Sequence, residues 1–142
     1  MHYRFAETDE EILACYPVMA ELRPHILKQE FVTQVRRQQK NGYCLACLED
    51  GEEIQAVIGF RISESLARGR YLYVDDLVSR APIRSRGYGQ ELFKWVVEFA
   101  KSEGCEALHL DSGVQKFAAH RFYLRNKMII SSHHFRLSLV GG

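Results

Sequence analysis

The sequence has no strong excess of charge of either sign, and this absence narrows its function. Its 19 lysine and arginine residues nearly balance 18 aspartate and glutamate residues, so the net charge is +1. Dedicated nucleic-acid binders are strongly basic, so no nucleic-acid partner is expected. Residues 1–60 hold six basic and ten acidic residues, and residues 61–142 hold 13 and eight. The basic C-terminal half suits a phosphorylated ligand, although scattered surface charge would give the same count.

Long apolar runs and cysteine pairs are also missing. No run approaches the ~20 residues of a membrane-spanning helix, so no membrane partner is expected. The acidic segment 1–12 lacks the apolar core of a signal peptide, which makes a cytoplasmic location the default. Cys44 and Cys47 form a lone Cys-x-x-Cys. On a strand they would face opposite sides, so the sequence predicts buried thiols and no metal site.

Length and periodicity predict one domain, residues 1–142, that mixes helices and strands. Thr8 and Glu11 have the spacing of a helix capping box, and Asp50-Gly51 lies between two β-rich runs, as in a hairpin. The other expected elements are a strand at 3–7, a helix at 26–40, a strand at 71–79, a helix at 89–103, a strand at 107–110, a helix at 115–125 capped by Asn126, and a strand region at 128–139.

The most informative stretch is Arg84-Ser-Arg-Gly87-Tyr-Gly89, which joins the strand at 71–79 to an amphipathic helix. The first turn of a helix presents unpaired N–H groups and partial positive charge, which together bind anions. Gly87 and Gly89 carry no Cβ, so a phosphate can approach the backbone. Three arginines surround this turn and could bind phosphate or form a solvated basic loop: Arg80, Arg84 and Arg86.

Two familiar phosphate motifs do not fit this turn. A P-loop requires Lys and then Ser or Thr after its glycine, but Gly89 is followed by Gln90 and Glu91. A dinucleotide fingerprint requires a small residue where Leu92 stands, and it belongs to the first strand-helix turn of a sheet. The turn therefore predicts a phosphate-bearing ligand of another kind.

Three sequence blocks in order resemble the GNAT superfamily of acetyl-CoA-dependent N-acetyltransferases. They are Asp75-Asp-Leu-Val78, the turn from Arg84 to Gly89, and Ala119-His-Arg-Phe-Tyr123, and the resemblance covers nearly the whole chain. It implies an α/β (α+β) fold in which about four helices flank a mixed, mostly antiparallel central sheet of about six to seven strands. It also implies acetyl-CoA as co-substrate, without a metal.

The resemblance implies two sets of coenzyme contacts. The pyrophosphate would bind the turn formed by Arg84, Ser85, Arg86, Gly87, Tyr88, Gly89 and Gln90, chiefly through the backbone amides from Ser85 onward. The pantetheine arm would pair like an added strand with the main chain of Leu77, Val78 and Ser79.

The resemblance also makes Tyr123 the general acid for the departing thiolate. A phenol with a pKa of about 10 stays protonated at neutral pH and can donate to a thiolate whose conjugate acid has a pKa of about 8.5. The alternative is a core aromatic residue, since Phe117 and Phe122 share the same amphipathic segment.

Asp75 and Asp76 match an acidic position that contacts the substrate amine in some members of the family. Adjacent strand residues face opposite sides, so only one of the two should line a cleft, and we favour Asp76, on the predicted face of Val74 and Val78. An aspartate is a weak base for an ammonium, so it would bind the amine or act through water. Alternatively, both carboxylates only satisfy the centre of the sheet.

The expected partner is a small-molecule primary amine. Protein or peptide N-acetylation is a second hypothesis. A non-catalytic acyl-CoA-binding module is a third, because Lys116 and Lys127 depart from the family pattern. A contact between Lys116 and the coenzyme is left open, as is a homodimer in which the last strand region extends a neighbour's sheet.

Overall fold

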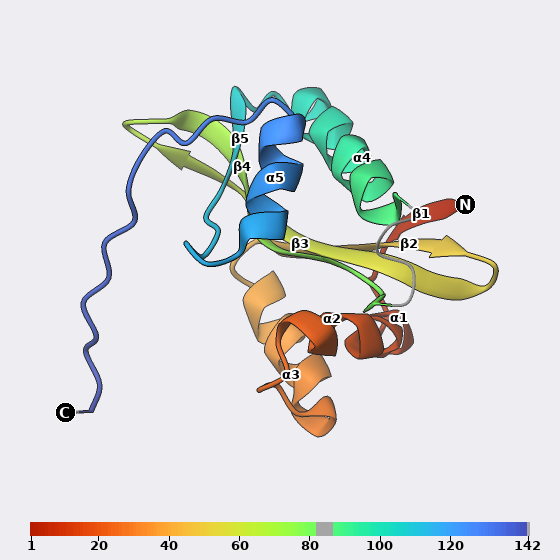
Figure 1. The fold of residues 1–142 in the computed structure, drawn as a ribbon. Helices are drawn as coiled ribbons and strands as arrows, with labels where there is room; N and C mark the ends of the chain where they lie inside the picture. Colours follow the sequence, from red (N-terminus) through yellow and green to blue (C-terminus); the bar gives the residue numbers. More distant parts are fainter. Residues whose placement is uncertain (82–86, 142) are drawn as a thin grey trace. The chain divides into compact units, whose positions relative to one another are not determined.

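A computed structural model describes residues 1–81 and 87–141 (Figure 1). The contacts divide the chain into two compact units, Met1–Leu110 and a second that begins at Asp111. The elements of these residues are, in chain order, β1 (His2–Phe5), α1 (Asp9–Ala14), α2 (Tyr16–Leu22), α3 (Lys28–Gln39), β2 (Tyr43–Asp50), β3 (Glu53–Ser65), β4 (Gly69–Ser79), α4 (Tyr88–Ser102), β5 (Ala107–Leu110) and α5 (Phe117–Arg125).

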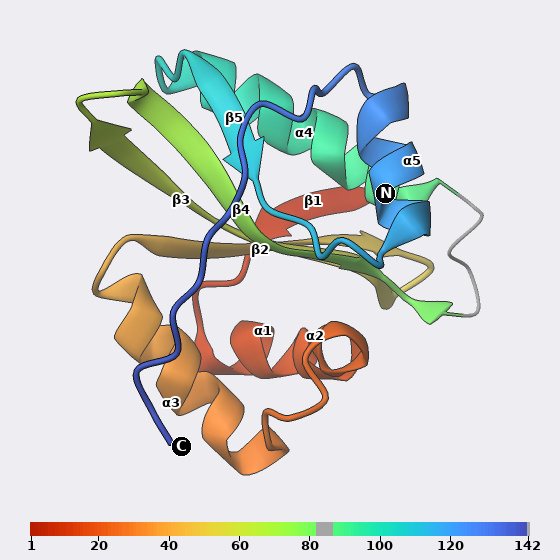
Figure 2. The same ribbon diagram turned by 60° about the vertical axis from the view of Figure 1, so that its left-hand side comes forward.

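The first unit is a five-stranded sheet between two layers of helices. The strands lie in sequence order, antiparallel except for the parallel pair β4–β5, which α4 connects. Figure 2 shows α1, α2 and α3 on one face of the sheet and α4 on the other. Each face has its own hydrophobic core, one centred on Leu45 and Val57 and the other on Ile58 and Phe60. This mixed, mostly antiparallel fold confirms the predicted class.

Local sequence signals explain most of the boundaries. The predicted capping box is present: the Thr8 hydroxyl accepts a hydrogen bond from the Glu11 N–H at 3.1 Å, and the Glu11 carboxylate accepts one from the Thr8 N–H at 2.9 Å. Pro17 lies in the first turn of α2, and the helical segment that begins at the capping box is divided into two helices, α1 and α2. Residues 1–81 and 87–141 therefore contain five helices where about four were expected.

The predicted strand region at 128–139 is wrong. Residues 128–141 form no strand in the structure, and large apolar residues there are exposed, among them Phe135 and Leu139. A strand requires a neighbour to complete its hydrogen-bond ladder, and this segment has none in the described chain. The described sheet accordingly has five strands, fewer than the expected six to seven. Lys127, rather than Asn126, has the positive φ after α5, at 67°.

A β-bulge interrupts β4 at its centre. Gly59 of β3 pairs with Asp76, but the next residue, Phe60, pairs with Val74, so Asp75 is an extra residue in β4. The extra residue reverses the alternation of side chains. As a result, Val74 packs in the core under α4 and Val78 in the core under α1–α3. The prediction that both share one face with Asp76 is wrong.

Candidate functional site

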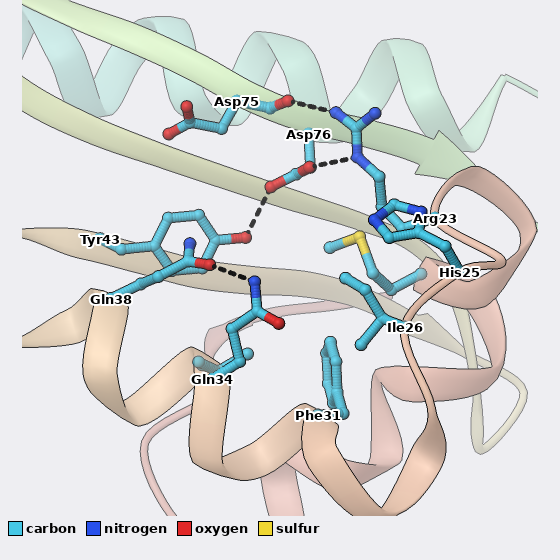
Figure 3. A pocket seen from close by; sticks show the side chains of 11 residues that line it. Arg23, His25, Ile26, Phe31, Gln34, Gln38, Tyr43, Asp75 and Asp76 are labelled. Atoms are coloured by element: carbon cyan, nitrogen blue, oxygen red, sulfur yellow. Dashed lines mark hydrogen bonds and ion pairs between the residues drawn. The ribbon is translucent and has the colours of Figure 1, made fainter. Parts of the chain in front are cut away.

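A cavity of about 300 Å³ lies in the first unit, between the helices α2 and α3 and the middle of β4 (Figure 3). Asp75 and Asp76 of β4 line one side, and the helical side combines apolar side chains with the amides of Gln34 and Gln38. The lining residues are Met19, Arg23, His25, Ile26, Phe31, Gln34, Val35, Gln38, Tyr43, Asp75 and Asp76. This volume suits part or all of a small molecule.

Two residues from other elements hold the Asp76 carboxylate. The Arg23 Nε donates to Asp76 Oδ1 at 2.9 Å, and the Tyr43 hydroxyl donates to Asp76 Oδ2 at 2.8 Å. The Asp76 side chain is only 13% exposed. Burial, together with the negative charge of Asp76 and the hydrogen bond to it, raises the pKa of Tyr43 well above its ordinary value. Tyr43 therefore keeps its proton at neutral pH and remains a donor.

Asp75 is also among the lining residues, whereas the sequence predicted that only one of the two aspartates would line a cleft. The bulge removes the strict alternation on which that prediction depended. The Asp75 carboxylate accepts two hydrogen bonds from Arg61, at 2.9 and 3.0 Å, and its backbone carbonyl accepts one from Arg23 Nη2 at 2.9 Å. Both carboxylates are therefore paired with an arginine.

Sequence reasoning missed Arg23 and Tyr43 as members of this site. Tyr43 lies directly over Gly59, where an added Cβ would be 1.8 Å from the tyrosine oxygen. An isolated glycine in the middle of a strand often indicates the close approach of another group. Gly59 was therefore the available signal for the tyrosine, whereas no local pattern pointed to Arg23.

The predicted pantetheine residues lie on a free edge of β4. β5 pairs with β4 only from Tyr71 to Val74. Beyond Val74, no strand in residues 1–81 or 87–141 pairs with this edge, while β3 continues along the other edge to Ser79. Leu77, Val78 and Ser79 therefore follow the two cavity carboxylates along an edge where an extended ligand can add main-chain hydrogen bonds.

The predicted phosphate turn is described only in part. Arg84, Ser85 and Arg86 lie outside the described residues. Gly87 caps α4 with a left-handed φ of 81°, and Tyr88, Gly89 and Gln90 form the first turn. A Cβ on Gly89 would be 3.9 Å from the Ser79 side chain, so this turn begins beside the end of β4.

Two side chains near this turn have partners of their own. The Tyr88 hydroxyl donates to Asp50 Oδ2 at 2.6 Å. Arg80, proposed above as a phosphate ligand, instead forms an ion pair with Glu53 at 3.0 Å and a hydrogen bond with Gln55 at 3.2 Å. In this part of the turn, the backbone N–H groups at the start of α4 are therefore the candidate for binding an anion, and not the side chains of Tyr88 and Arg80.

Tyr123 lies on α5, in the second unit, where its ring packs edge-to-face on Phe122 at 5.4 Å between centroids. Burial raises the pKa of its phenol above the ordinary value. The phenol is therefore protonated at neutral pH, as a proton donor must be. Lys116, whose coenzyme contact was left open, is exposed at the N-cap of α5.

The described residues contain no cluster of three or more metal-ligating side chains. Cys44 and Cys47 are free thiols that pack on opposite faces of the sheet, which confirms the predicted orientation. None of the helices described is both long and apolar enough to cross a membrane.

Comparison with known proteins identifies the family of this chain. The model of the Acetyltransferase (GNAT) family matches residues 5–127. The chain belongs to the GNAT acetyltransferase family. The Uncharacterized N-acetyltransferase YhdJ of Bacillus subtilis is 34% identical over 96% of this chain and 97% of its own. The Aminoalkylphosphonate N-acetyltransferase of Salmonella typhimurium is 27% identical over 92% of this chain and 86% of its own.

Solved structures show the same fold. A GNAT family acetyltransferase of Staphylococcus aureus superposes with a TM-score of 0.81 at 19% identity, covering 97% of this chain and 98% of its own. This GNAT chain is thus an acyltransferase of the N-acetyltransferase type, in a family that generally uses acetyl-CoA as co-substrate.

Proposed function

We propose that this GNAT protein transfers the acetyl group of acetyl-CoA to the primary amine of a small molecule. The observation that carries the proposal is the position of the cavity: its carboxylate end, Asp75 and Asp76, runs directly into the free edge at Leu77–Ser79. An amine held by the carboxylates would meet a thioester whose arm lies along that edge. The cavity volume of about 300 Å³ favours a small acceptor over a protein segment.

The coenzyme would bind at two places. Main-chain groups of Leu77, Val78 and Ser79 would pair with the pantetheine arm. The backbone amides of the turn that ends in Gly87, Tyr88, Gly89 and Gln90, together with Arg84, Ser85 and Arg86, would bind the pyrophosphate, because helix N-termini favour anions. The helix α4 begins beside Ser79. This position supports the proposal that one extended ligand binds both the edge of β4 and the start of the helix.

The transfer would occur by direct attack. The amine nitrogen attacks the thioester carbonyl carbon, a C–N bond forms, and the C–S bond breaks with its electron pair on sulfur. Tyr123 then donates its hydroxyl proton to this thiolate and regains one from water. Asp75 and Asp76 hold the amine, and its proton leaves through water, since both carboxylates already accept hydrogen bonds from arginine.

The general-acid role predicts a specific loss in Tyr123→Phe. We expect kcat for thiol release to fall by about 10²–10⁴-fold, the usual contribution of general acid catalysis, with KM for acetyl-CoA nearly unchanged. Because burial raises the pKa of Tyr123, the alkaline loss of wild-type activity that comes from this phenol should occur at a higher pH than for an ordinary phenol, which is half ionised near pH ~10.

Tyr71→Phe is the matched control, because Tyr71 lies in β4 at the far end of the strand from the cavity carboxylates. It should retain full activity. Full kcat for Tyr123→Phe across the pH range would show that another group protonates the thiolate.

The choice of a small-molecule acceptor is tested by a thiol-release screen of amines, amino acids and short peptides. A relative named for aminoalkylphosphonates supports a free amine. Mass shifts found only on peptides would overturn this part of the proposal.

A further inference from the structure

Two basic side chains, Arg23 and His25, line the cavity together with the carboxylates. Both belong to the end of α2 and the segment that follows it, across from β4 (Figure 3). A site that only binds an ammonium group gains nothing from a guanidinium beside its carboxylates, because the two cations repel each other. The presence of Arg23 and His25 therefore requires a separate explanation.

The charges of the carboxylate end are already balanced. Asp76 is paired with Arg23 at 2.9 Å and Asp75 with Arg61 at 2.9 Å. Two arginines and two aspartates have no net charge, so this end does not attract a molecule with several positive charges. An acceptor with one ammonium and one anionic group would keep the site neutral and place each charge beside its opposite.

Donors remain for an anion. The Nε and Nη2 atoms of Arg23 bind Asp76 and the Asp75 carbonyl, and the third nitrogen, Nη1, has no hydrogen-bond partner among the described residues. The exposed His25 ring likewise has no partner in that part of the chain. A carboxylate or phosphonate can accept hydrogen bonds from both groups.

We infer that the acceptor is a short zwitterion, a primary amine that also carries a carboxylate or phosphonate group bound by Arg23 and His25. Because Arg23 touches both aspartates, the anion site adjoins the amine site, and the two groups of the acceptor are separated by only a few bonds. Ile26 and Phe31 provide an apolar wall for that linker. The inference rests on the proposed function, whose acceptor it specifies.

The test compares four amines of similar length in the thiol-release assay with acetyl-CoA: 3-aminopropanoate, 2-aminoethylphosphonate, propylamine and 1,3-diaminopropane. We expect kcat/KM for at least one zwitterion to exceed that for propylamine and for the diamine by about tenfold or more, as one charge-assisted interaction supplies. The two zwitterions separate a carboxylate from a phosphonate.

Variants then locate the anion. His25→Gln should lower kcat/KM for the preferred zwitterion by about tenfold and leave propylamine unchanged. Arg23→Gln should give a larger loss for the zwitterion, although it also disturbs Asp76. Lys28→Gln removes a nearby cation that does not line the cavity and should have no effect.

Three results would overturn the inference. Propylamine as good an acceptor as the zwitterions would exclude an anion site while leaving the proposed function intact. An equal fall in kcat/KM for all four amines in His25→Gln would also exclude an anion site at His25 while leaving the proposed function intact. No thiol release with any of the four amines would count against the proposed function and, with it, the inference.

Discussion

At the scale of single residues, the Tyr43 hydroxyl determines how Asp76 is presented to the cavity. It donates to Oδ2 while Arg23 binds Oδ1, so both carboxylate oxygens are fixed in a largely buried side chain. A hydrogen bond to a charged, buried group contributes more than one between neutral groups. Tyr43 also depends on Gly59 of the neighbouring strand, because only a glycine at position 59 leaves room for the tyrosine ring.

Tyr43→Phe should therefore destabilise the protein by about 1–3 kcal/mol, since it leaves a buried carboxylate oxygen without its donor. Urea unfolding measures this loss. Tyr16→Phe is the matched control: its hydroxyl donates at 2.7 Å to the neutral Ile26 carbonyl in the same core, so its loss should be nearer 1 kcal/mol. An equal loss of unfolding free energy in the two variants would contradict the idea that the hydrogen bond to the Asp76 carboxylate contributes more than one to a neutral carbonyl.

The raised pKa of Tyr43 also predicts how stability depends on pH. In the unfolded chain this phenol ionises near its ordinary pKa of about 10, whereas in the folded protein it stays protonated to higher pH. The free energy of unfolding should therefore fall as pH rises above about 10, because the unfolded state releases the proton first. Urea unfolding between pH 8 and 11 should show a shallower fall in Tyr43→Phe; an identical fall would contradict this assignment.

At the scale of elements, two irregularities of regular structure create the site. The bulge at Asp75 places two adjacent aspartates beside one cavity, and β5 ends at Leu110, so no other described strand pairs with that edge of β4 beyond Val74. The helix α4 then begins beside Ser79 with a left-handed Gly87. Each irregularity exposes main-chain groups that a regular sheet or helix would satisfy internally.

The two glycines of the α4 turn should respond differently to alanine. Gly87→Ala places a Cβ on a residue with a φ of 81° and should cost about 1–2 kcal/mol in thermal unfolding. Gly89→Ala meets Ser79 only at an ordinary 3.9 Å, so stability should be nearly unchanged. Its methyl group would hinder the approach of a phosphate, however, and calorimetry should show weaker coenzyme A binding. Unchanged binding would remove this turn from the coenzyme site.

The elements also show which structure the sequence could predict. The capping box at Thr8, the hairpin after Asp50 and the helix α4 follow from residues within a few positions of one another, and all were predicted. The bulge was missed because it depends on how β3 and β4 pair, so residues far apart in the chain determine it. Strict alternation consequently assigned Val74 and Val78 to one face, incorrectly.

At the scale of the whole molecule, the C-terminal segment, residues 128–141, carries several highly exposed apolar residues close together in the sequence. Six large apolar side chains there are at least 80% exposed: Ile129, Ile130, Phe135, Leu137, Leu139 and Val140. Large contiguous apolar surfaces are unusual in monomers and are commonly covered by a partner. The homodimer left open by the sequence therefore remains a testable prediction.

Sedimentation velocity should show concentration-dependent association of the wild-type protein. The double variant Phe135→Ser, Leu137→Ser should shift it toward monomer, because it removes apolar area from this segment. Leu66→Ser is the control, since Leu66 is also highly exposed but lies at the β3–β4 turn, outside the C-terminal segment. A monomeric wild-type protein at all concentrations would exclude this association.

The sequence by itself determined the class of fold, the helix that follows Gly87 and the family, because short-range spacing and three ordered blocks encode them. Only the tertiary structure decided the composition of the cavity. Arg23 and Tyr43 reach Asp76 from 53 and 33 positions away in the chain. No local periodicity encodes such contacts, since they depend on the packing of α2 and on the bulge that positions the carboxylates.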